Sequence, residues 1–431
     1  MRIGTGRQGM TGKRRGMSAV IAMSAMLMAA LAFPGPSAAI DVNPVTGACA
    51  PGLTPATPTP FPSAPASASP TVSASPSPTI APAGMLPLGG SWRPMAPAPF
   101  ASWQGVGAWT GHRAIIVAPD AHRAASYDPA GDRWRPLPRP PRPFPAYGAA
   151  FWTGREVVFV GGYPSGDDSK AATIGVAYDP HAGTWRRLPR SPLDAYDGAV
   201  WAGGRVIVTT TSDGGEHDDG IGAYDPARDC WSVLPLPPIL TPWGLTGAGD
   251  HLVASGTEFP GDAPRTIAVM DMGTLTWGPP MMTPLDADAA PLLWTGGDRL
   301  LTLAEPQIDS GAAASGPPGL LDATVDAATA LWTPLTASCP MNTREALWTG
   351  RIVLDSDLAF DEATEACYTV PPSHDRHRRD PLQLWTGREA IIWSGGGGEE
   401  IPPTADGVIY GPPAWATEPG VDPAGRGADP W

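Results

Sequence analysis

The sequence predicts an all-β protein, a seven-bladed β-propeller closed by an N-terminal strand and preceded by a signal peptide and a disordered Pro/Ser/Ala-rich linker. Three observations lead to this fold class. A Trp-Thr-Gly element recurs along the chain, a second tryptophan follows Tyr-Asp-Pro at a fixed distance, and one unpartnered tryptophan element precedes the first unit. Units of this length that hold only short β-branched and aromatic runs predict small sheets that pack on one another.

Residues 1–39 have the composition of a secretory signal peptide, with cleavage expected after Ala39. Five basic residues and no acidic one precede and flank the apolar run 18–33. The alternative is an uncleaved membrane anchor, although this run is short against the roughly 20 residues that span a bilayer. Arginine is frequent and lysine rare in a chain rich in alanine and glycine. We therefore expect a secreted or surface-attached bacterial protein that meets a membrane only through such an anchor.

Residues 40–90 are expected to form a disordered linker. No charged residue lies between Asp41 and Arg93, and Pro, Ala, Ser and Thr dominate. Such a segment has too little large apolar surface to offset the entropy of ordering it. Residues 50–84 in an extended polyproline conformation would reach roughly 100 Å and could hold the following domain away from an anchor. A propeller is expected over residues 91–413 and a disordered tail over residues 414–431.

The repeat unit is clearest over residues 148–189. Its Trp-Thr-Gly element recurs at Trp109, Trp152, Trp294, Trp348 and Trp385, as Trp-Ala-Gly at Trp201, and in eroded form around Gly247. The second tryptophan recurs at Trp134, Trp185, Trp231, Trp277 and Trp332, and Tyr368 is expected to take the sixth position. Met270 and Asp361 are expected in the tyrosine slots of the fourth and sixth units.

Each unit is expected to form four short strands. Thr-Gly between two apolar runs predicts a hairpin, and Asp-Pro followed by small residues predicts a second turn. The last unit has no tryptophan strand after it, whereas Trp92 and Arg93 stand alone before the first. We therefore expect the strand at Trp92 to complete the last blade and close the ring.

These motifs resemble the kelch repeat. The resemblance rests on the glycine pairs Gly161-Gly162 and Gly395-Gly396, on Tyr-Asp-Pro and on the tryptophan seven residues later, and it covers residues 92–413. It implies a secreted bacterial member of the galactose oxidase/kelch-type propellers. In such propellers the loops that enter the innermost strands lie with the loops between second and third strands on one face, where partners bind.

Residues that the repeat does not explain are the candidates for binding. Aromatic residues precede the innermost strand in four consecutive units, and polar residues do so in later units; the candidate ligand-binding residues are Trp103, Tyr147, Tyr196, Trp243, Asp286 and Arg344. Aromatic rings can stack on sugars or anchor a peptide. The alternative is that these rings plug the channel or cap the blade edges.

The expected function is non-covalent recognition of an extracellular glycan or protein by a monomer. The net charge of −14 argues against nucleic acid as a partner. One alternative is a propeller enzyme acting on carbohydrates, similar to galactose oxidase or sialidase, and another is a structural spacer. The copper site of galactose oxidase needs two histidines, two tyrosines and a cysteine joined to one tyrosine, and no position-by-position match is found. No catalytic residue is assigned.

Four cysteines in an exported chain are compatible with two disulfides. Cys339 and Cys367 are closest in sequence and are the first candidate pair, whereas Cys49 and Cys230 are left open as paired or free. No two cysteines have metal-ligand spacing. Acidic loops offer calcium as a weaker alternative without EF-hand spacing, so no cofactor is expected.

Overall fold

The structure is a computed structural model whose described residues belong to one compact unit, Pro44–Trp431. It describes residues 49, 85–103, 105–142, 144–146, 148–161, 163–164, 175–193, 198–210, 220–239, 241–257, 266–282, 292–296, 299–301, 319–323, 330–335, 339, 341, 346–355, 357–373, 381–395 and 403–417. The predicted signal peptide, most of the predicted linker and residues 418–431 of the predicted tail lie outside these ranges. Among the described residues, no helix is long and apolar enough to cross a membrane.

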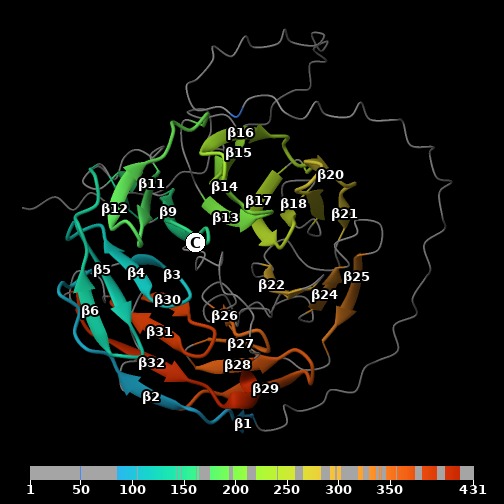
Figure 1. Cartoon of the computed structure of the whole chain (residues 1–431). Helices are drawn as coiled ribbons and strands as arrows, with labels where there is room; N and C mark the ends of the chain where they lie inside the picture. The colour runs from blue at the N-terminus through green and yellow to red at the C-terminus, as the bar shows by residue number, and fades with distance from the viewer. Residues whose placement is uncertain are drawn as a thin grey trace, which may run out of the picture. The chain divides into compact units, whose positions relative to one another are not determined.

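Antiparallel sheets of strands that follow one another in the chain make up the fold (Figure 1). The first comprises β3 (Val106–Trp109), β4 (Ala114–Ala118), β5 (Arg123–Asp128) and β6 (Arg133–Pro136). The second comprises β8 (Ala149–Trp152), β9 (Val157–Val160), β11 (Val176–Asp179) and β12 (Thr184–Arg187). The third comprises β13 (Gly198–Ala202), β14 (Arg205–Thr210), β15 (Gly220–Asp225) and β16 (Cys230–Leu234).

The later sheets repeat this order. The fourth comprises β17 (Thr241–Ala248), β18 (His251–Thr257), β19 (Thr266–Asp271) and β20 (Thr276–Trp277), with β21 (Met281–Met282) added beside β19. The next comprises β22 (Leu293–Gly296), β23 (Arg299–Leu301), β24 (Gly319–Ala323) and β25 (Ala330–Pro334). It is followed by β26 (Leu347–Trp348), β27 (Ile352–Leu354), β28 (Leu358–Asp361) and β29 (Ala366–Thr369), and then by β30 (Leu382–Trp385), β31 (Ala390–Trp393) and β32 (Gly407–Gly411).

The N-terminal strand β2 (Ser91–Pro94) closes the arrangement. It pairs antiparallel with β32, and Trp92 lies opposite Tyr410 in the register that Trp134 and Tyr127 have in the first sheet. Trp92 also donates its indole N–H to the carbonyl of Pro371 at 2.7 Å. Residues far apart in the sequence thus complete one sheet, as the unpartnered Trp92 element predicted.

The first strands of neighbouring sheets contact one another in series. Strand β3 contacts β8 and β30, β13 contacts β8 and β17, β17 contacts β22, and β26 contacts β30. Leu293 and Leu301 share a buried cluster with Trp348 and Val353, which joins the sheets of β22 and β26. The sheets therefore form a propeller around a common centre (Figure 1). Where β13 and β17 approach, a Cβ at Gly247 would lie 1.9 Å from the carbonyl oxygen of Trp201, which explains the glycine of the eroded element.

The outer-strand tryptophans tie each sheet to the one before it. Their indole N–H groups donate to backbone carbonyls four residues beyond the tryptophan position of the preceding sheet: Trp134 to Ala96, Trp185 to Pro138, Trp231 to Pro189 and Trp277 to Pro235. An indole N–H that packs between sheets needs a partner, and a backbone carbonyl supplies one without a matching side chain. This contact explains why Trp and the following Pro recur together.

The sixth unit differs from the sequence prediction by one residue. The ladder places Phe360 opposite Cys367, the register of Tyr127 and Trp134, so Phe360 occupies the tyrosine slot and Cys367 the tryptophan slot. The assignment of Asp361 and Tyr368 to these slots was wrong, because Asp361 is the counterpart of the aspartate in Tyr-Asp-Pro: its Oδ1 accepts the N–H of Ala363. Met270 does occupy the tyrosine slot, opposite Trp277.

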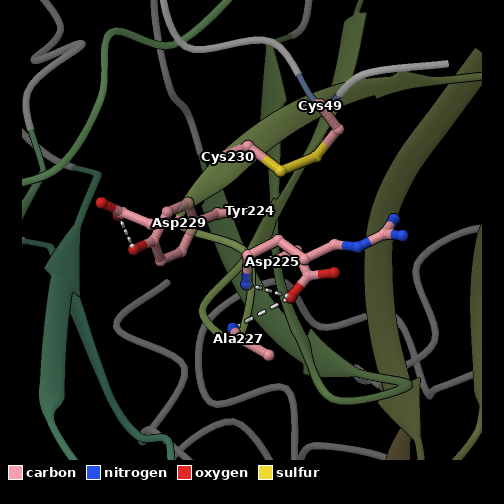
Figure 2. Close-up of a disulfide and its surroundings, with 7 residues drawn as sticks. Cys49, Tyr224, Asp225, Ala227, Asp229 and Cys230 are labelled. Carbon is pink, nitrogen blue, oxygen red and sulfur yellow. Dashed lines mark hydrogen bonds between the residues drawn. A yellow bond between two sulfur atoms is a disulfide. The ribbon is translucent and has the colours of Figure 1, made fainter. Parts of the chain in front are cut away.

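Both ends of the segment 50–84 are attached to the outer edges of sheets. Cys49 forms a disulfide with Cys230 at the start of β16, and its N–H donates to the carbonyl of Trp231 at 2.9 Å (Figure 2). At the other end β1 (Leu86–Pro87) pairs in parallel with β29. Residues 50–84 themselves lie outside the described ranges, so the reach of about 100 Å expected for this segment stays a prediction.

The first residues of the predicted tail are packed against the sheet of β26. Ala414–Ala416 form a 3₁₀ turn, η2, and Ala416 is fully buried. The hydroxyl of Thr349 donates to the carbonyl of Ala416 at 2.7 Å, and Trp415 lies beside Tyr368. The ordered unit therefore extends through Thr417.

Candidate binding face

The loop that enters β3 presents an exposed tryptophan on a fixed backbone. The carboxylate of Asp120, which follows β4, accepts the hydroxyl of Ser102 at 2.6 Å and the backbone N–H of Trp103 at 2.9 Å. Ser102 is fully buried, whereas Trp103 is 39% exposed. Because both carboxylate oxygens hold one loop, the indole ring is presented without the entropy loss that an unrestrained loop would suffer on binding.

The same loop is joined to the last sheet. Ser102 forms a β-bridge with Thr404, and the buried hydroxyl of Ser394, just after β31, donates to the carbonyl of Ser102. Strand β3 follows this loop and β31 precedes Ser394, so both contacts lie at the end of the sheets where innermost strands begin and second strands end. We call this end the strand-entry face.

Two inner hairpins are extended at the strand-entry face. Beyond β8 and β9, the short strands β7 (Pro145–Ala146) and β10 (Tyr163–Pro164) pair with each other. In the fourth sheet β17 and β18 pair as far as Thr241 and Thr257, with a bulge between Pro242 and Gly244. Bulges re-aim side chains at sheet ends. At this face, two hairpins therefore continue their strand pairing beyond the four-stranded sheets.

Of the six predicted ligand-binding residues, the structure describes Trp103 and the backbone of Trp243. Trp103 lies on the strand-entry face as expected from its place before β3. The backbone of Trp243 lies in the bulge of β17, at the same end of its sheet. Tyr147, Tyr196, Asp286 and Arg344 lie outside the described residues. Their roles stay predictions.

Cys339 and Cys367 form the second disulfide. Cys367 occupies the tryptophan slot of β29, and Cys339 follows the outer strand of the preceding sheet. This disulfide therefore joins a sheet to the one before it, as the indole hydrogen bonds do for other pairs of consecutive sheets.

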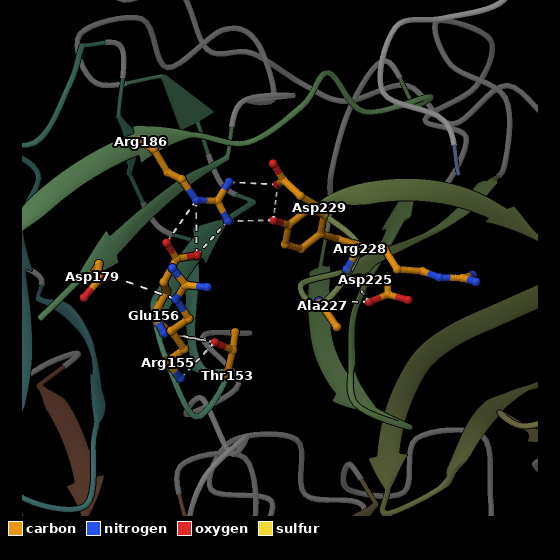
Figure 3. A network of polar contacts seen from close by, with 10 residues as sticks. Thr153, Arg155, Glu156, Asp179, Arg186, Asp225, Ala227, Arg228 and Asp229 are labelled. Atoms are coloured by element: carbon orange, nitrogen blue, oxygen red, sulfur yellow. Dashed lines mark hydrogen bonds and ion pairs between the residues drawn. The ribbon is translucent and has the colours of Figure 1, made fainter. Parts of the chain in front are cut away.

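The opposite end of the sheets carries an ionic network that links neighbours (Figure 3). Arg186 on β12 binds Glu156 of its own sheet at 2.6 Å and reaches Asp229 and the Tyr224 hydroxyl of the next sheet at 2.8 and 3.0 Å. Arg93 likewise binds Glu389 at 3.1 Å and the carbonyl of Pro129 in the first sheet. These contacts join elements of the scaffold to one another.

The buried tyrosines in this network stay protonated. Burial, and then the hydrogen bond to Asp132, raise the pKa of Tyr127 well above its usual value, although Arg93 opposes the shift. Burial and Asp229 raise the pKa of Tyr224 in the same way. A tyrosine that is buried and hydrogen-bonded in a repeat slot contributes to packing between the strands.

The side chains present do not fit the copper site of galactose oxidase. All four cysteines of the chain are in disulfides, so none can be joined to a tyrosine. Tyr127, Tyr178, Tyr224 and Tyr410 occupy the repeat slot, and the part of the chain that the structure describes contains no group of three His, Cys, Asp or Glu side chains that could hold a metal ion. The donor set therefore gives no support to copper chemistry.

Sequence reasoning missed a group of arginines beside Trp103. Arg139 and Arg142 lie in the Pro-Arg-Pro-Pro-Arg-Pro segment that leads from β6 to the second sheet, and Arg123 begins β5. All three are exposed. The alternation of proline and arginine in this segment could have indicated the group, but the segment lies between repeat motifs and belongs to neither.

Comparison with solved structures supports the fold. A fungal alcohol oxidase of the AA5 family, solved in complex with copper, superposes with a TM-score of 0.51 at 14% identity over 77% of this chain and 79% of that one. The structure of YjhT covers 73% of this chain and 95% of its own at 14% identity, with a TM-score of 0.41. No family profile matches the chain, and no curated sequence is similar to it. The oxidase likeness shows the β-propeller fold and nothing of the chemistry.

Proposed function

We propose that this chain is an exported binding module, a kelch-type propeller that recognises an extracellular glycan or protein at its strand-entry face. The observation that carries the proposal is Trp103, whose ring is exposed while Asp120 and Ser102 fix its backbone. Exposed aromatic rings held in this way are typical anchors of sugars and peptides. The disulfides favour an oxidising compartment, in agreement with the signal peptide predicted over residues 1–39.

We further propose that the propeller has seven blades, with the sheet β22–β25 as a blade of its own. Its inner strand contacts β17 and shares a buried cluster with the sheet of β26, so it has a neighbour on each side. Six blades would leave this sheet outside the ring. Residues 302–318 and 324–329 of the sheet lie outside the described ranges, so an experimental structure of this part tests the count directly.

A glycan and secreted-protein array tests the function. Wild-type protein is expected to capture a ligand reproducibly, and Trp103→Ala is expected to weaken capture at least about tenfold, because truncating an aromatic anchor costs about 2 kcal/mol or more. The matched control is Trp415→Ala, since Trp415 is also exposed (45%) but lies on η2. No capture by the wild type, or equal loss in both variants, contradicts the proposal.

A further inference from the structure

The segment that leads from β6 to the second sheet is held at both ends. Its first carbonyl, that of Pro138, accepts the indole N–H of Trp185 at 2.8 Å. At its far end Phe144 is fully buried, with its ring against those of Phe159 and Trp185. Between these points Arg187 donates to the carbonyl of Arg142. The backbone of this segment is therefore anchored, although the side chains of Arg139 and Arg142 are exposed.

The prolines of this segment favour an extended backbone at its two arginines. Proline fixes its own φ near −65°, and it disfavours the helical conformation in the residue before it. Pro140 follows Arg139, and Pro143 follows Arg142. In a polyproline conformation, residues three apart return to the same side of the chain about 9 Å from each other. Arg139 and Arg142 have this spacing.

Two further arginines lie beside this pair. The N–H of Leu137 donates to the carbonyl of Ala124, which places the start of the segment next to Arg123 at the beginning of β5. Arg187 reaches Arg142 through the hydrogen bond to its carbonyl. We call Arg123, Arg139, Arg142 and Arg187 the cationic strip. In the part of the chain that the structure describes, no carboxylate forms an ion pair with any of the four.

The strip borders the site of Trp103. Asp120, which holds the Trp103 backbone, and His122 belong to the turn that leads into Arg123. His122 is half-buried, its Nδ1 has no hydrogen-bond partner, and burial together with the charges of Arg142 and Arg139 lowers its pKa. The nearest carboxylate on this turn, Asp120, has both oxygens occupied by Ser102 and Trp103. Asp120 therefore holds the Trp103 loop rather than any arginine of the strip, and the four arginines outnumber the one carboxylate on this turn.

We propose that the cationic strip and Trp103 together bind an extended anionic polysaccharide, whose charged groups pair with the arginines while a sugar ring stacks on the indole. The net charge of −14 would repel a polyanion elsewhere on the molecule, so binding is confined to this strip. Guanidinium groups pair in bidentate fashion with carboxylate and sulfate groups. The inference rests on the proposed binding function and names the ligand class of the same face.

Retention on immobilised polysaccharides tests the inference with the full chain and both disulfides intact. Polygalacturonate and dextran sulfate distinguish carboxylate from sulfate ligands, and unmodified dextran is the neutral control. The wild type is expected to bind at least one charged matrix and to elute as salt rises, because the Debye length falls from about 10 Å at 0.1 M to about 3 Å at 1 M. No retention at low salt, or equal retention on unmodified dextran, overturns the inference.

Charge reversal identifies the surface responsible. R139E/R142E is expected to weaken retention at least about tenfold, because like charges at a binding surface repel strongly. R388E is the matched control, since Arg388 is exposed in the turn between β30 and β31 at the opposite end of the sheets. Thermal unfolding of both variants is expected to match the wild type. Equal loss in R388E and R139E/R142E overturns the assignment to the strip.

Two more outcomes separate this inference from the proposed function. Equal retention of double-stranded DNA would show general polyanion binding and overturn recognition of polysaccharide. Capture of an uncharged array ligand that depends on Trp103, without retention on either charged matrix, would leave the proposed function standing and remove the strip. Retention that depends on Arg139 and Arg142 supports the inference.

Discussion

The tyrosine slots of the repeat differ in the hydrogen bond that the tyrosine hydroxyl makes. Tyr127 and Tyr224 each donate to an aspartate five residues later, Asp132 and Asp229, at 2.6 Å. That aspartate has a positive φ, as does Gly183 at the same position after Tyr178. Tyr178 thus shares the slot and the burial but has glycine, not aspartate, at the fifth position after it. The sequence predicted the slots, but it could not show this pairing, because five residues separate the partners around a turn.

Replacing Tyr127 by phenylalanine is expected to lower the free energy of unfolding by about 1 kcal/mol. The substitution removes one hydrogen bond and leaves Asp132 less well satisfied. Tyr178→Phe is the control and is expected to change stability little, since no hydroxyl partner is lost. Urea unfolding of both variants measures the difference, and equal effects would contradict the role given to Asp132.

Gly183 offers the reverse substitution. Gly183→Ala is expected to cost about 1 kcal/mol, because φ is 69° and a Cβ there meets no atom within 4 Å, so backbone strain alone acts. Gly183→Asp is expected to cost less, because aspartate tolerates this conformation and can accept the Tyr178 hydroxyl. In a Tyr178→Phe background the advantage of Asp over Ala should shrink, as measured by a double-mutant cycle in urea. An undiminished advantage would rule out the proposed hydrogen bond.

The turn aspartates predict how stability depends on pH. Hydrogen bonds from the backbone N–H groups of Ala182 and His181 lower the pKa of Asp179 against the opposing effect of burial, and Arg155 adds to the lowering. The pKa of Asp271 is lowered in the same manner by the N–H groups of Thr274 and Gly273. A carboxyl with a lowered pKa in the folded state stabilises the fold above its unfolded pKa of about 3.9 and loses that contribution as pH falls.

We therefore expect the free energy of unfolding to decrease as the pH falls below about 4. Asp179→Asn keeps an oxygen acceptor for the turn but removes the titrating group, so its stability should fall less steeply with acid. Urea titrations at a series of pH values compare the slopes. Identical slopes for wild type and variant would show that Asp179 contributes nothing to acid unfolding.

At the scale of the elements, side chains of the outer strands bind each sheet to the one before it, through an indole hydrogen bond or, in the sixth unit, a disulfide. Indole groups donate to the preceding sheet wherever tryptophan occupies the slot and is described, whereas the disulfide of Cys367 with Cys339 takes this place in the sixth unit. The sequence predicted four strands per unit because turn residues punctuate them. It misplaced the sixth unit by one residue, because the motif had lost both Tyr and Trp there and only the ladder shows the register.

The double substitution of Cys339 and Cys367 by serine is expected to lower stability by about 3 kcal/mol, since a cross-link over 28 residues restricts the unfolded chain. Chemical denaturation under oxidising conditions measures the loss. The double substitution of Cys49 and Cys230 removes the bond that attaches Cys49 to β16 and is the comparison. An unchanged midpoint in the Cys339/Cys367 variant would contradict a role for this bond in holding the two sheets together.

At the scale of the whole molecule, the chain ends determine what the propeller can present. Strand β2 completes the last sheet, β1 pairs with β29, and Cys49 is bound to β16. Cys230 follows the turn after β15, at the end of its sheet opposite the strand-entry face. The sequence predicted closure from one orphan tryptophan, but the disulfide that fixes Cys49 depended on spatial proximity that no local pattern encodes.

The central claim is that β2 closes the ring, and calorimetry of two truncations tests it most directly. The chain 85–431 keeps β1 and β2, whereas 97–431 lacks both; each carries Cys230→Ser to avoid a free thiol. We predict one cooperative transition near that of the full chain for 85–431, and loss of cooperative unfolding for 97–431, because β32 and Pro371 lose their partners. A cooperative transition of undiminished enthalpy in 97–431 would contradict closure by β2.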